Sequence, residues 1–271
     1  MGNLFFYIVV FVFGLAVGSF LNCVIYRLSL IPKGRSFCPY CKHILSWQDL
    51  IPVLSFLILK GKCRYCQKKI SLQYPLVEIA TGLLFLLIFN FEFLISNKIL
   101  ILNFETITYL LYLLIISSLL LIIFVFDLKH YIIPDKIIFS AIFIVLLFRI
   151  LELIQNSKLE IQNLNPVFSG LGAAGFFLFI VLISRGKWMG FGDVKLAFLM
   201  GLFLGFPNIL VALFLAFLIG AIIGVGMILF GKKTLKSEVP FGPFLVTGTF
   251  IALFWGEIII NFYLNLFILT F

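Results

Sequence analysis

Long apolar runs, separated by short polar stretches, dominate the sequence and predict helices that cross a membrane. A helix needs about 20 apolar residues to span a bilayer. Eight runs approach this length, although the sixth is short, and they cover residues 4–26, 76–95, 106–126, 136–153, 166–184, 193–206, 208–230 and 244–266. The first run has no basic segment before it and no small-residue cleavage site, so we expect a retained helix rather than a signal peptide. The pattern predicts an all-α polytopic membrane protein with about eight transmembrane helices.

One long polar insert, from Arg27 to Pro75, separates the first two apolar runs. It is the only polar stretch long enough to form a small domain of its own. We therefore expect two parts: residues 1–80, which hold the first helix and the insert, and residues 81–271, which are embedded in the membrane.

Composition supports the membrane assignment and the charge distribution suggests an orientation. Hydrophobic residues make up 63% of the chain and charged residues 11%, whereas a soluble globular protein has about 25% charged residues. The net charge of +9 falls in short basic clusters between apolar runs, so we expect no nucleic-acid partner. The loops opposite the insert hold only Lys98 and Lys158, with Arg149 near that end of the fourth span. By the positive-inside rule the insert is cytoplasmic and both termini are external.

Two Cys-x-x-Cys pairs in the insert predict a metal site. They are separated by a stretch close to the spacing of four-cysteine zinc sites, and each pair can supply two corners of one tetrahedron. A redox-active dithiol is the alternative, but it usually sits in a strand-helix context and needs only one pair. A site closed by four thiolates leaves no position for a substrate, so the expected Zn²⁺ is structural. The predicted ligands are Cys38, Cys41, Cys63 and Cys66.

Two carboxylates at the edges of apolar runs are the candidates for chemistry. Asp127 ends the third predicted span and Asp193 begins the sixth, so the predicted topology brings both to the cytoplasmic membrane boundary. Ionised groups are rare in such places unless they are functional. Two neighbouring aspartates share one proton, so one can activate a water while the other hydrogen-bonds a scissile carbonyl. The alternative is a transporter whose aspartates bind cations or relay protons.

Residues around Asp193 have both functional and structural interpretations. Gly190 and Gly192 permit backbone geometry closed to other residues and would let a substrate backbone come near. Lys195 could hold a substrate carboxylate or simply reach the membrane interface. Asp135, which follows Pro134 and precedes an apolar run, is interpreted as a helix N-cap rather than as a third catalytic carboxylate.

A literal G-x-G-x-x-G motif, residues 170–175, lies inside the fifth span. It has no preceding strand and no acidic residue at the expected distance, so the context of a dinucleotide site is missing. We interpret its glycines as helix-packing positions, like the pair Gly14 and Gly18 in the first span.

Several motifs, taken in order, resemble those of the type IV prepilin peptidases, bifunctional leader peptidases and N-methyltransferases that belong to the GxGD aspartic proteases. The resemblance runs through most of the chain. The matching stretches are Gly18-Ser19-Phe20-Leu21-Asn22, Tyr26-Arg27-Leu28, the two cysteine pairs, Tyr74-Pro75-Leu76-Val77-Glu78, Asp127 with Ile133-Pro134-Asp135, Gly190 to Lys195, and Pro240-Phe241-Gly242-Pro243-Phe244.

This resemblance implies that Asp127 and Asp193 are catalytic, that the four cysteines bind zinc and that residues 1–80 are linked to methylation by S-adenosylmethionine. Residues 81–271 would then be the aspartic peptidase domain. The implied partners are prepilins or pseudopilins, cleaved after a glycine at the cytoplasmic face of a bacterial inner membrane.

Two further groups of residues have both a functional and a structural interpretation. Pro240 and Gly242 lie in a segment that cannot form a regular helix and could pair with substrate as an added strand, or be a simple loop. Glu78 could receive the new N-terminal ammonium or the amine of S-adenosylmethionine, or be an ordinary carboxylate near a helix N-terminus. No sequence signal locates the S-adenosylmethionine pocket.

Overall fold

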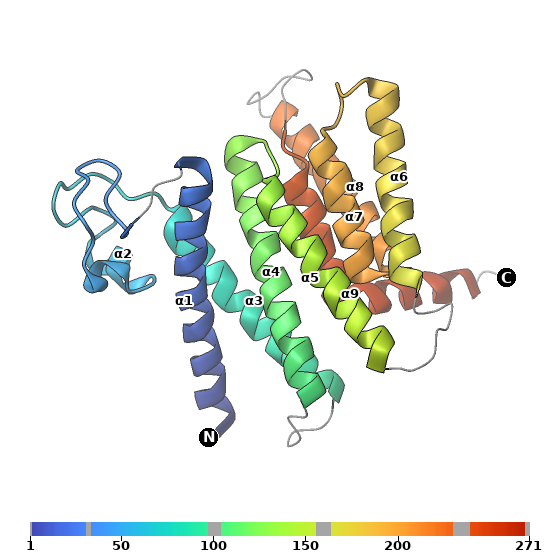
Figure 1. Ribbon diagram of the computed structural model, residues 1–271, viewed down its shortest axis with the longest axis horizontal. Coiled ribbons are helices and arrows are strands. Elements are labelled where there is room, and N and C mark those ends of the chain that lie inside the picture. The colour runs from blue at the N-terminus through green and yellow to red at the C-terminus, as the bar shows by residue number, and fades with distance from the viewer. Residues whose placement is uncertain (1, 31–33, 97–103, 156–163, 230–238, 269–271) are drawn as a thin grey trace. The chain divides into compact units, whose positions relative to one another are not determined.

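The computed structural model describes residues 2–30, 34–96, 104–155, 164–229 and 239–268, which are nearly all helical (Figure 1). Within these ranges the only β-structure is two isolated bridges in the insert. The chain divides into two compact units, residues 1–122 and 123–271. The functional division expected near residue 80 stays a prediction, because a compact unit is defined by packing and not by activity.

Among the described residues, seven helices are long and apolar enough to cross a membrane. They are α1 (Gly2–Leu30), α3 (Gln73–Ser96), α4 (Phe104–His130), α5 (Asp135–Gln155), α6 (Asn165–Ser184), α8 (Asn208–Leu229) and α9 (Gly242–Ile268). The remaining expected span is the 14-residue helix α7 (Phe191–Leu204). At 1.5 Å per residue it is about 21 Å long, against a hydrocarbon core of about 30 Å.

The first unit is built on the packing of α1 along α3. Glycines make this contact close: a Cβ added at Gly14 would lie 2.7 Å from the Cα of Gly82, and one at Gly18 would lie 2.7 Å from the Cα of Glu78. Real Cβ atoms do not approach other atoms so closely, so neither position of α1 accepts a side chain without moving α3. The predicted packing role of Gly14 and Gly18 is confirmed.

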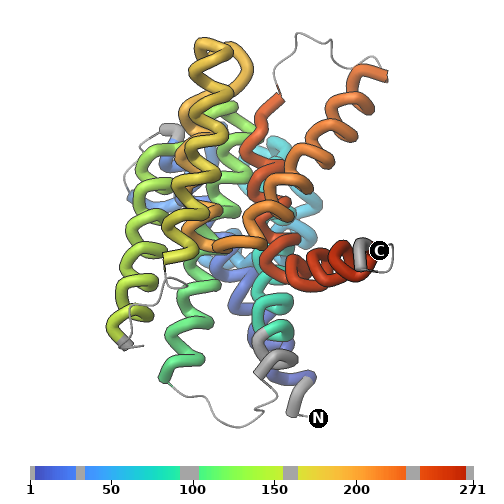
Figure 2. Tube along the Cα trace, turned by 90° about the vertical axis from the view of Figure 1, so that its right-hand side faces the viewer, coloured from blue at the N-terminus to red at the C-terminus, as the bar shows by residue number. Residues whose placement is uncertain are grey.

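The short helix α7 is the centre of the second unit, with α5, α6, α8 and α9 packed against it; α8 also packs along α9 (Figure 2). From Leu196 onward its sequence is apolar on every side, as expected of a helix surrounded by others. A Cβ at Gly201 would lie 2.5 Å from the Cα of Gly170. The packing role predicted for the glycine motif therefore holds for Gly170 but not for Gly172 or Gly175, whose Cβ positions have no atom within 4 Å.

Arg149 of α5 closes the far end of α7. Its Nη2 donates to the carbonyl of Phe203 at 2.9 Å and its Nε to that of Leu202 at 3.4 Å. Glu152 pairs with its Nη1 at 2.8 Å. The last carbonyls of a helix have no partner within the helix, and a cation near them is favourable. This contact lets α7 end short of a full membrane span without exposing bare carbonyls to lipid.

Candidate active site and metal centre

Asp193 is the third residue of α7, where the chain enters the helix. The N–H of Gly190 donates to Asp193 Oδ2 at 3.3 Å, and the N–H of Asp193 donates to the carbonyl of Gly190 at 3.2 Å. This reciprocal pairing orders the start of α7. A Cβ at Gly192 would lie 3.2 Å from the Cβ of Ile133, so this glycine lets the start of α7 approach the segment that follows α4.

Asp127 lies in the last turn of α4 and is 4% exposed. Its carboxylate accepts a hydrogen bond from the N–H of Gly242, the first residue of α9. A Cβ at Gly242 would lie 2.5 Å from Asp127 Oδ2, so only glycine fits there. A helix N-terminus carries unpaired N–H groups and a partial positive charge, and both stabilise an anionic carboxylate.

The fold brings the two predicted aspartates together. Asp127 and Asp193 both belong to the second unit, and they lie close enough for their carboxylates to interact electrostatically. Each carboxylate accepts one backbone N–H, from Gly242 and Gly190 respectively. Such a pair can hold one proton between two acids, which is the state required to activate a water and polarise a carbonyl.

Lys195 has a partner inside the protein. Its Nζ lies 2.6 Å from Asp135 Oδ1 and 5.1 Å from the centroid of the Phe139 ring. Asp135 is in the first turn of α5, so this ion pair joins α5 to α7 two residues beyond Asp193. Contact of Lys195 with a substrate carboxylate stays a prediction, and Asp135 would compete for that lysine.

The expectation that the segment of Pro240 and Gly242 cannot be helical is wrong for Gly242, where α9 begins, because Pro243 is tolerated in the first turn of a helix. Among the described residues before α9, Val239, Pro240 and Phe241 are non-helical. Phe241 packs against Phe217 of α8, with ring centroids 5.1 Å apart. The backbone N–H of Gly242 is engaged by Asp127. Substrate pairing with Pro240 and Gly242 stays a prediction, and the structure gives Gly242 a role at the aspartate that the sequence did not suggest.

The insert forms the expected four-sulfur cluster. The four Sγ atoms all lie within 4.8 Å of one another, and those of Cys38 and Cys66 are 3.9 Å apart. No disulfide joins these cysteines. A Zn–S bond of about 2.3 Å in a tetrahedron requires sulfurs roughly 3.8 Å apart, so the cluster fits Zn²⁺.

The two cysteine pairs adopt the same turn. The N–H of Lys42 donates to the carbonyl of Cys38 at 2.9 Å, and that of Gln67 to the carbonyl of Cys63 at 3.0 Å. Although partial burial opposes the shift, backbone N–H groups of the turn lower the pKa of the Cys38 thiol to about 7. Thiolate is the form that binds metal, so at Cys38 the turn favours the ligand state. At Cys66 the backbone hydrogen bond from Lys68 acts in the same direction, but desolvation and the neighbouring thiols raise the pKa to about 11.

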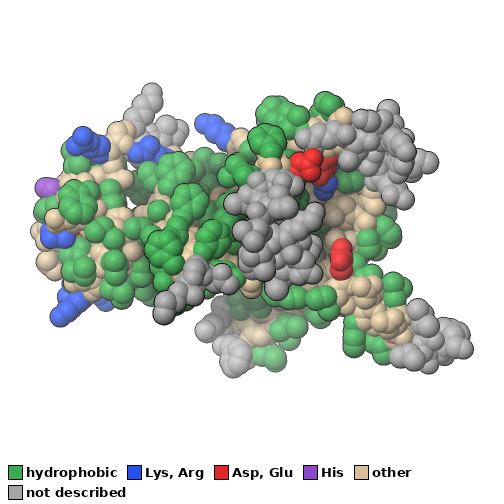
Figure 3. All heavy atoms as spheres, turned by 90° about the horizontal axis from the view of Figure 1, so that it is seen from below, with side chains coloured by type: hydrophobic (Ala, Val, Ile, Leu, Met, Phe, Trp, Pro, Cys, Tyr) green, Lys and Arg blue, Asp and Glu red, His purple; other side chains and the backbone are tan. Residues whose placement is uncertain are grey.

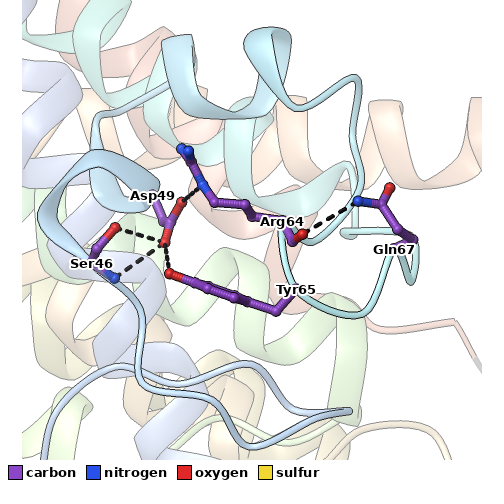
Figure 4. Close-up of polar contacts among 5 residues, drawn as sticks. All are labelled: Ser46, Asp49, Arg64, Tyr65 and Gln67. Carbon is purple, nitrogen blue, oxygen red and sulfur yellow. Dashed lines mark hydrogen bonds and ion pairs between the residues drawn. The ribbon is translucent and has the colours of Figure 1, made fainter.

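A hydrogen-bonded carboxylate, missed at the sequence level, ties the second cysteine pair to the rest of the insert (Figure 4). Asp49 accepts from Arg64 Nε at 2.8 Å, from Ser46 Oγ at 2.9 Å and from the Tyr65 hydroxyl at 3.3 Å. Partial desolvation works against the shift, but these donors hold the pKa of Asp49 below its usual value. The S-x-x-D pattern of Ser46 and Asp49 is a capping signal that could have identified it.

Glu78 is buried, with 7% of its surface exposed, at the contact of α1 with α3. Its Oε2 accepts the N–H of Val53 at 2.7 Å, and its carboxylate also interacts with the Ser19 side chain. One turn along α1, Asn22 donates from Nδ2 to the carbonyl of Tyr74 at 3.0 Å. Asn22 Oδ1 is buried without a hydrogen-bond partner among the described residues. These buried acceptors are the candidate amine-binding groups of the first unit.

Comparisons with known proteins find relatives that align with nearly the whole chain. Residues 12–91 match the Bacterial Peptidase A24 N-terminal domain, and residues 114–225 match the Type IV leader peptidase family. The chain is 34% identical to the prepilin leader peptidase/N-methyltransferase of Bacillus subtilis, over 95% of this chain and 98% of that protein. It is 34% identical to the protein of the same name from Legionella pneumophila, over 96% and 95%, and 30% identical to that from Pseudomonas aeruginosa, over 93% and 91%. No solved structure gives a significant match.

Proposed function

The chain belongs to the type IV leader peptidase family, and on that premise we propose that it cleaves the leader from prepilins or pseudopilins and then methylates the new N-terminus. It is a multi-pass membrane protein. None of the relatives named above is a transporter, so the ion-pathway interpretation of the aspartates has no support.

The observation that carries the peptidase proposal is the placement of Asp127, whose carboxylate contacts the start of α9, within electrostatic reach of Asp193 at the start of α7. In the reaction, the ionised aspartate takes a proton from water while the protonated one donates a hydrogen bond to the scissile carbonyl. The water oxygen bonds to the carbonyl carbon and a tetrahedral intermediate forms. The C–N bond then breaks, and the departing amine takes a proton from an aspartate. No covalent intermediate with the protein is needed.

For the second activity, S-adenosylmethionine supplies, when bound, a methyl group on a positively charged sulfur. The amine that receives the methyl group must be neutral when it attacks. Before it loses its proton, the ammonium form needs a hydrogen-bond acceptor that holds it in place. Glu78 and Asn22 Oδ1, both buried at the α1–α3 contact, supply such acceptors. We expect Glu78→Gln to reduce methylation while cleavage continues. The same substitution is expected to weaken equilibrium binding of labelled S-adenosylmethionine.

We assign the four-cysteine cluster to structural Zn²⁺, because a closed thiolate site offers no open position for chemistry. Folded, purified protein is expected to contain one zinc per chain by elemental analysis. Protein that is folded and contains no metal would overturn this assignment. We also propose the orientation of the chain, in a bacterial inner membrane with the insert and the aspartates cytoplasmic and the termini external.

The peptidase test incubates membranes carrying the protein with a prepilin and measures the product mass. Asp127→Asn and Asp193→Asn, which keep side-chain size, are each expected to lower the cleavage rate at least about a hundredfold. Asp135→Asn is the matched control, because it alters a carboxylate near Asp193 to which we assign no chemistry. Cleavage by both Asp127→Asn and Asp193→Asn would reject the proposal. A product whose mass does not depend on S-adenosylmethionine would remove the methylation claim alone.

A further inference from the structure

The insert exposes a group of large apolar side chains on and beside the short helix α2 (Leu54–Ile58). Leu57 is 62% exposed and Ile58 is 74% exposed, and a contiguous group of exposed apolar side chains marks a surface that contacts protein or membrane. Figure 3 shows hydrophobic side chains over a broad area at its left, where the insert lies, with Lys and Arg side chains at the edge. We call this group the α2 patch; it consists of Trp47, Leu50, Leu54, Leu57 and Ile58.

The attachment of α2 to the membrane helices fixes the depth of the patch. Val53, the residue before α2, donates its N–H to Glu78 Oε2 at 2.7 Å. Glu78 is the sixth residue of α3, which places it about 8 Å along the helix from Gln73. It also packs on Gly18, which lies ten residues, or about 15 Å, inside the end of the α1 span at Leu28. The patch therefore begins at a level where both neighbouring helices are already within their apolar spans.

Val53 keeps a backbone conformation that indicates a firm anchor. Its φ is +58°, a region that β-branched residues rarely adopt and that surrounding contacts must stabilise. The hydrogen bond from Val53 to Glu78 is such a contact. The α2 patch is thus held against the α1–α3 pair rather than hanging on a free loop.

The backbone and charges of the segment suit a lipid interface. The N–H groups of Leu57, Leu59, Lys60 and Lys62 are paired with backbone carbonyls between Val53 and Leu59, as a low-dielectric setting requires. Lys60 and Lys62 follow α2 directly and are exposed. Lysines beside an apolar surface can place their amines among anionic headgroups while their methylenes stay in the apolar layer.

We propose that the α2 patch is a membrane-interface element that inserts into the boundary between headgroups and acyl chains, with Lys60 and Lys62 on anionic lipid. Interfacial segments of this kind bury their apolar face about 5–10 Å deep, which agrees with the position of Glu78 about 8 Å along α3 from Gln73. The insert is then a lipid-docked module and not a domain suspended in the cytosol. This inference rests on the exposed residues and their anchor and does not depend on the proposed enzyme activities.

The test places one tryptophan on the patch. Full-length protein with Trp47, Trp188 and Trp255 changed to Phe carries either Leu57→Trp or Ile58→Trp and is reconstituted in vesicles containing phosphatidylglycerol. The matched control in the same background is Tyr40→Trp, an aromatic exchange at an exposed position in the first cysteine pair. Retained zinc content and a single protease-resistant species show which variants are folded.

Lipids brominated on their acyl chains are expected to lower the fluorescence of the Leu57→Trp and Ile58→Trp proteins about twofold or more and to leave the Tyr40→Trp control unchanged. Adding Lys60→Gln and Lys62→Gln is expected to reduce the dependence of quenching on phosphatidylglycerol. Quenching of the patch probes by aqueous acrylamide but not by brominated lipid would overturn the proposal. Protection that disappears when protein is diluted into excess lipid would also overturn it, because a second copy would then be the occupant.

Discussion

Gly242→Ala is the sharpest perturbation of the aspartate pair, because it adds one methyl group and leaves every charged side chain in place. The new Cβ would lie 2.5 Å from Asp127 Oδ2 and 3.2 Å from its Cγ. A normal carbon–oxygen contact needs roughly 3.2 Å or more, so the carboxylate must move by about 0.7 Å. The backbone N–H of residue 242, which donates to Asp127, remains in the variant. The change is therefore almost purely steric.

The expected effect on cleavage is large and that on folding is moderate. A displacement of about 1 Å at a catalytic group can lower the rate about a hundredfold. An extra methyl in a packed site costs about 1–3 kcal/mol of folding free energy. We expect Gly242→Ala to lower the cleavage rate constant by about one to two orders of magnitude while methylation of an already cleaved substrate continues. The assay follows both products by mass in purified protein.

Gly224→Ala in α8 is the matched control, since a Cβ there has no atom within 4 Å. It is expected to cleave like the unchanged protein. The two variants share residue type and added volume, and the added methyl meets Asp127 only in Gly242→Ala. Cleavage by Gly242→Ala at the unchanged rate would refute the reasoning that the start of α9 positions this aspartate.

Three other perturbations have defined outcomes. Arg149→Met should lower the free energy of unfolding by about 1–3 kcal/mol, because it leaves the last carbonyls of α7 unpaired. Calorimetry in detergent measures this loss, and an unchanged stability would reject the capping role of Arg149. Lys195→Met should lower the free energy of unfolding by only about 0.2–1 kcal/mol, since the ion pair of Lys195 with Asp135 is partly exposed. A double-mutant cycle with Asp135→Asn that gives no coupling energy would contradict a stabilising ion pair. The pKa of Asp49 is lower in the folded protein than in the unfolded chain. Its hydrogen bonds therefore stabilise the insert above the unfolded pKa of Asp, and this contribution disappears as pH falls through the folded pKa. Zinc release on acidification should begin at higher pH in Asp49→Asn, and identical release profiles would show that these hydrogen bonds do not support the site.

Features that depend on local sequence pattern could be predicted. Seven of the eight predicted apolar runs correspond to long helices in the described part of the chain, because span length is set by the bilayer and not by tertiary contacts. The cysteine pairs predicted a compact four-sulfur cluster because each ligand pair lies within one turn. Asp127 and Asp193 stand out in the sequence because charged residues are costly at apolar boundaries, whatever surrounds them; their catalytic role stays a prediction.

Features that depend on which helices meet could not be predicted. The contact of Gly242 with Asp127 joins residues more than a hundred positions apart, and no pattern in either segment specifies it. Arg149 was read only as a marker of membrane orientation, whereas its carbonyl partners lie on α7. The bond from Val53 to Glu78 likewise needs the insert folded against α3. In each case the partner is a backbone atom, which side-chain patterns do not reveal.

The central claim is that Asp127 and Asp193 act as one unit, and the most direct test compares cleavage rates of purified Asp127→Asn, Asp193→Asn and the double variant. Residues that act together are non-additive, so each single change is expected to lower the rate at least about a hundredfold and the double change to lower it no further. Single losses that multiply in the double variant, or a single variant that retains cleavage, would contradict the shared-proton mechanism.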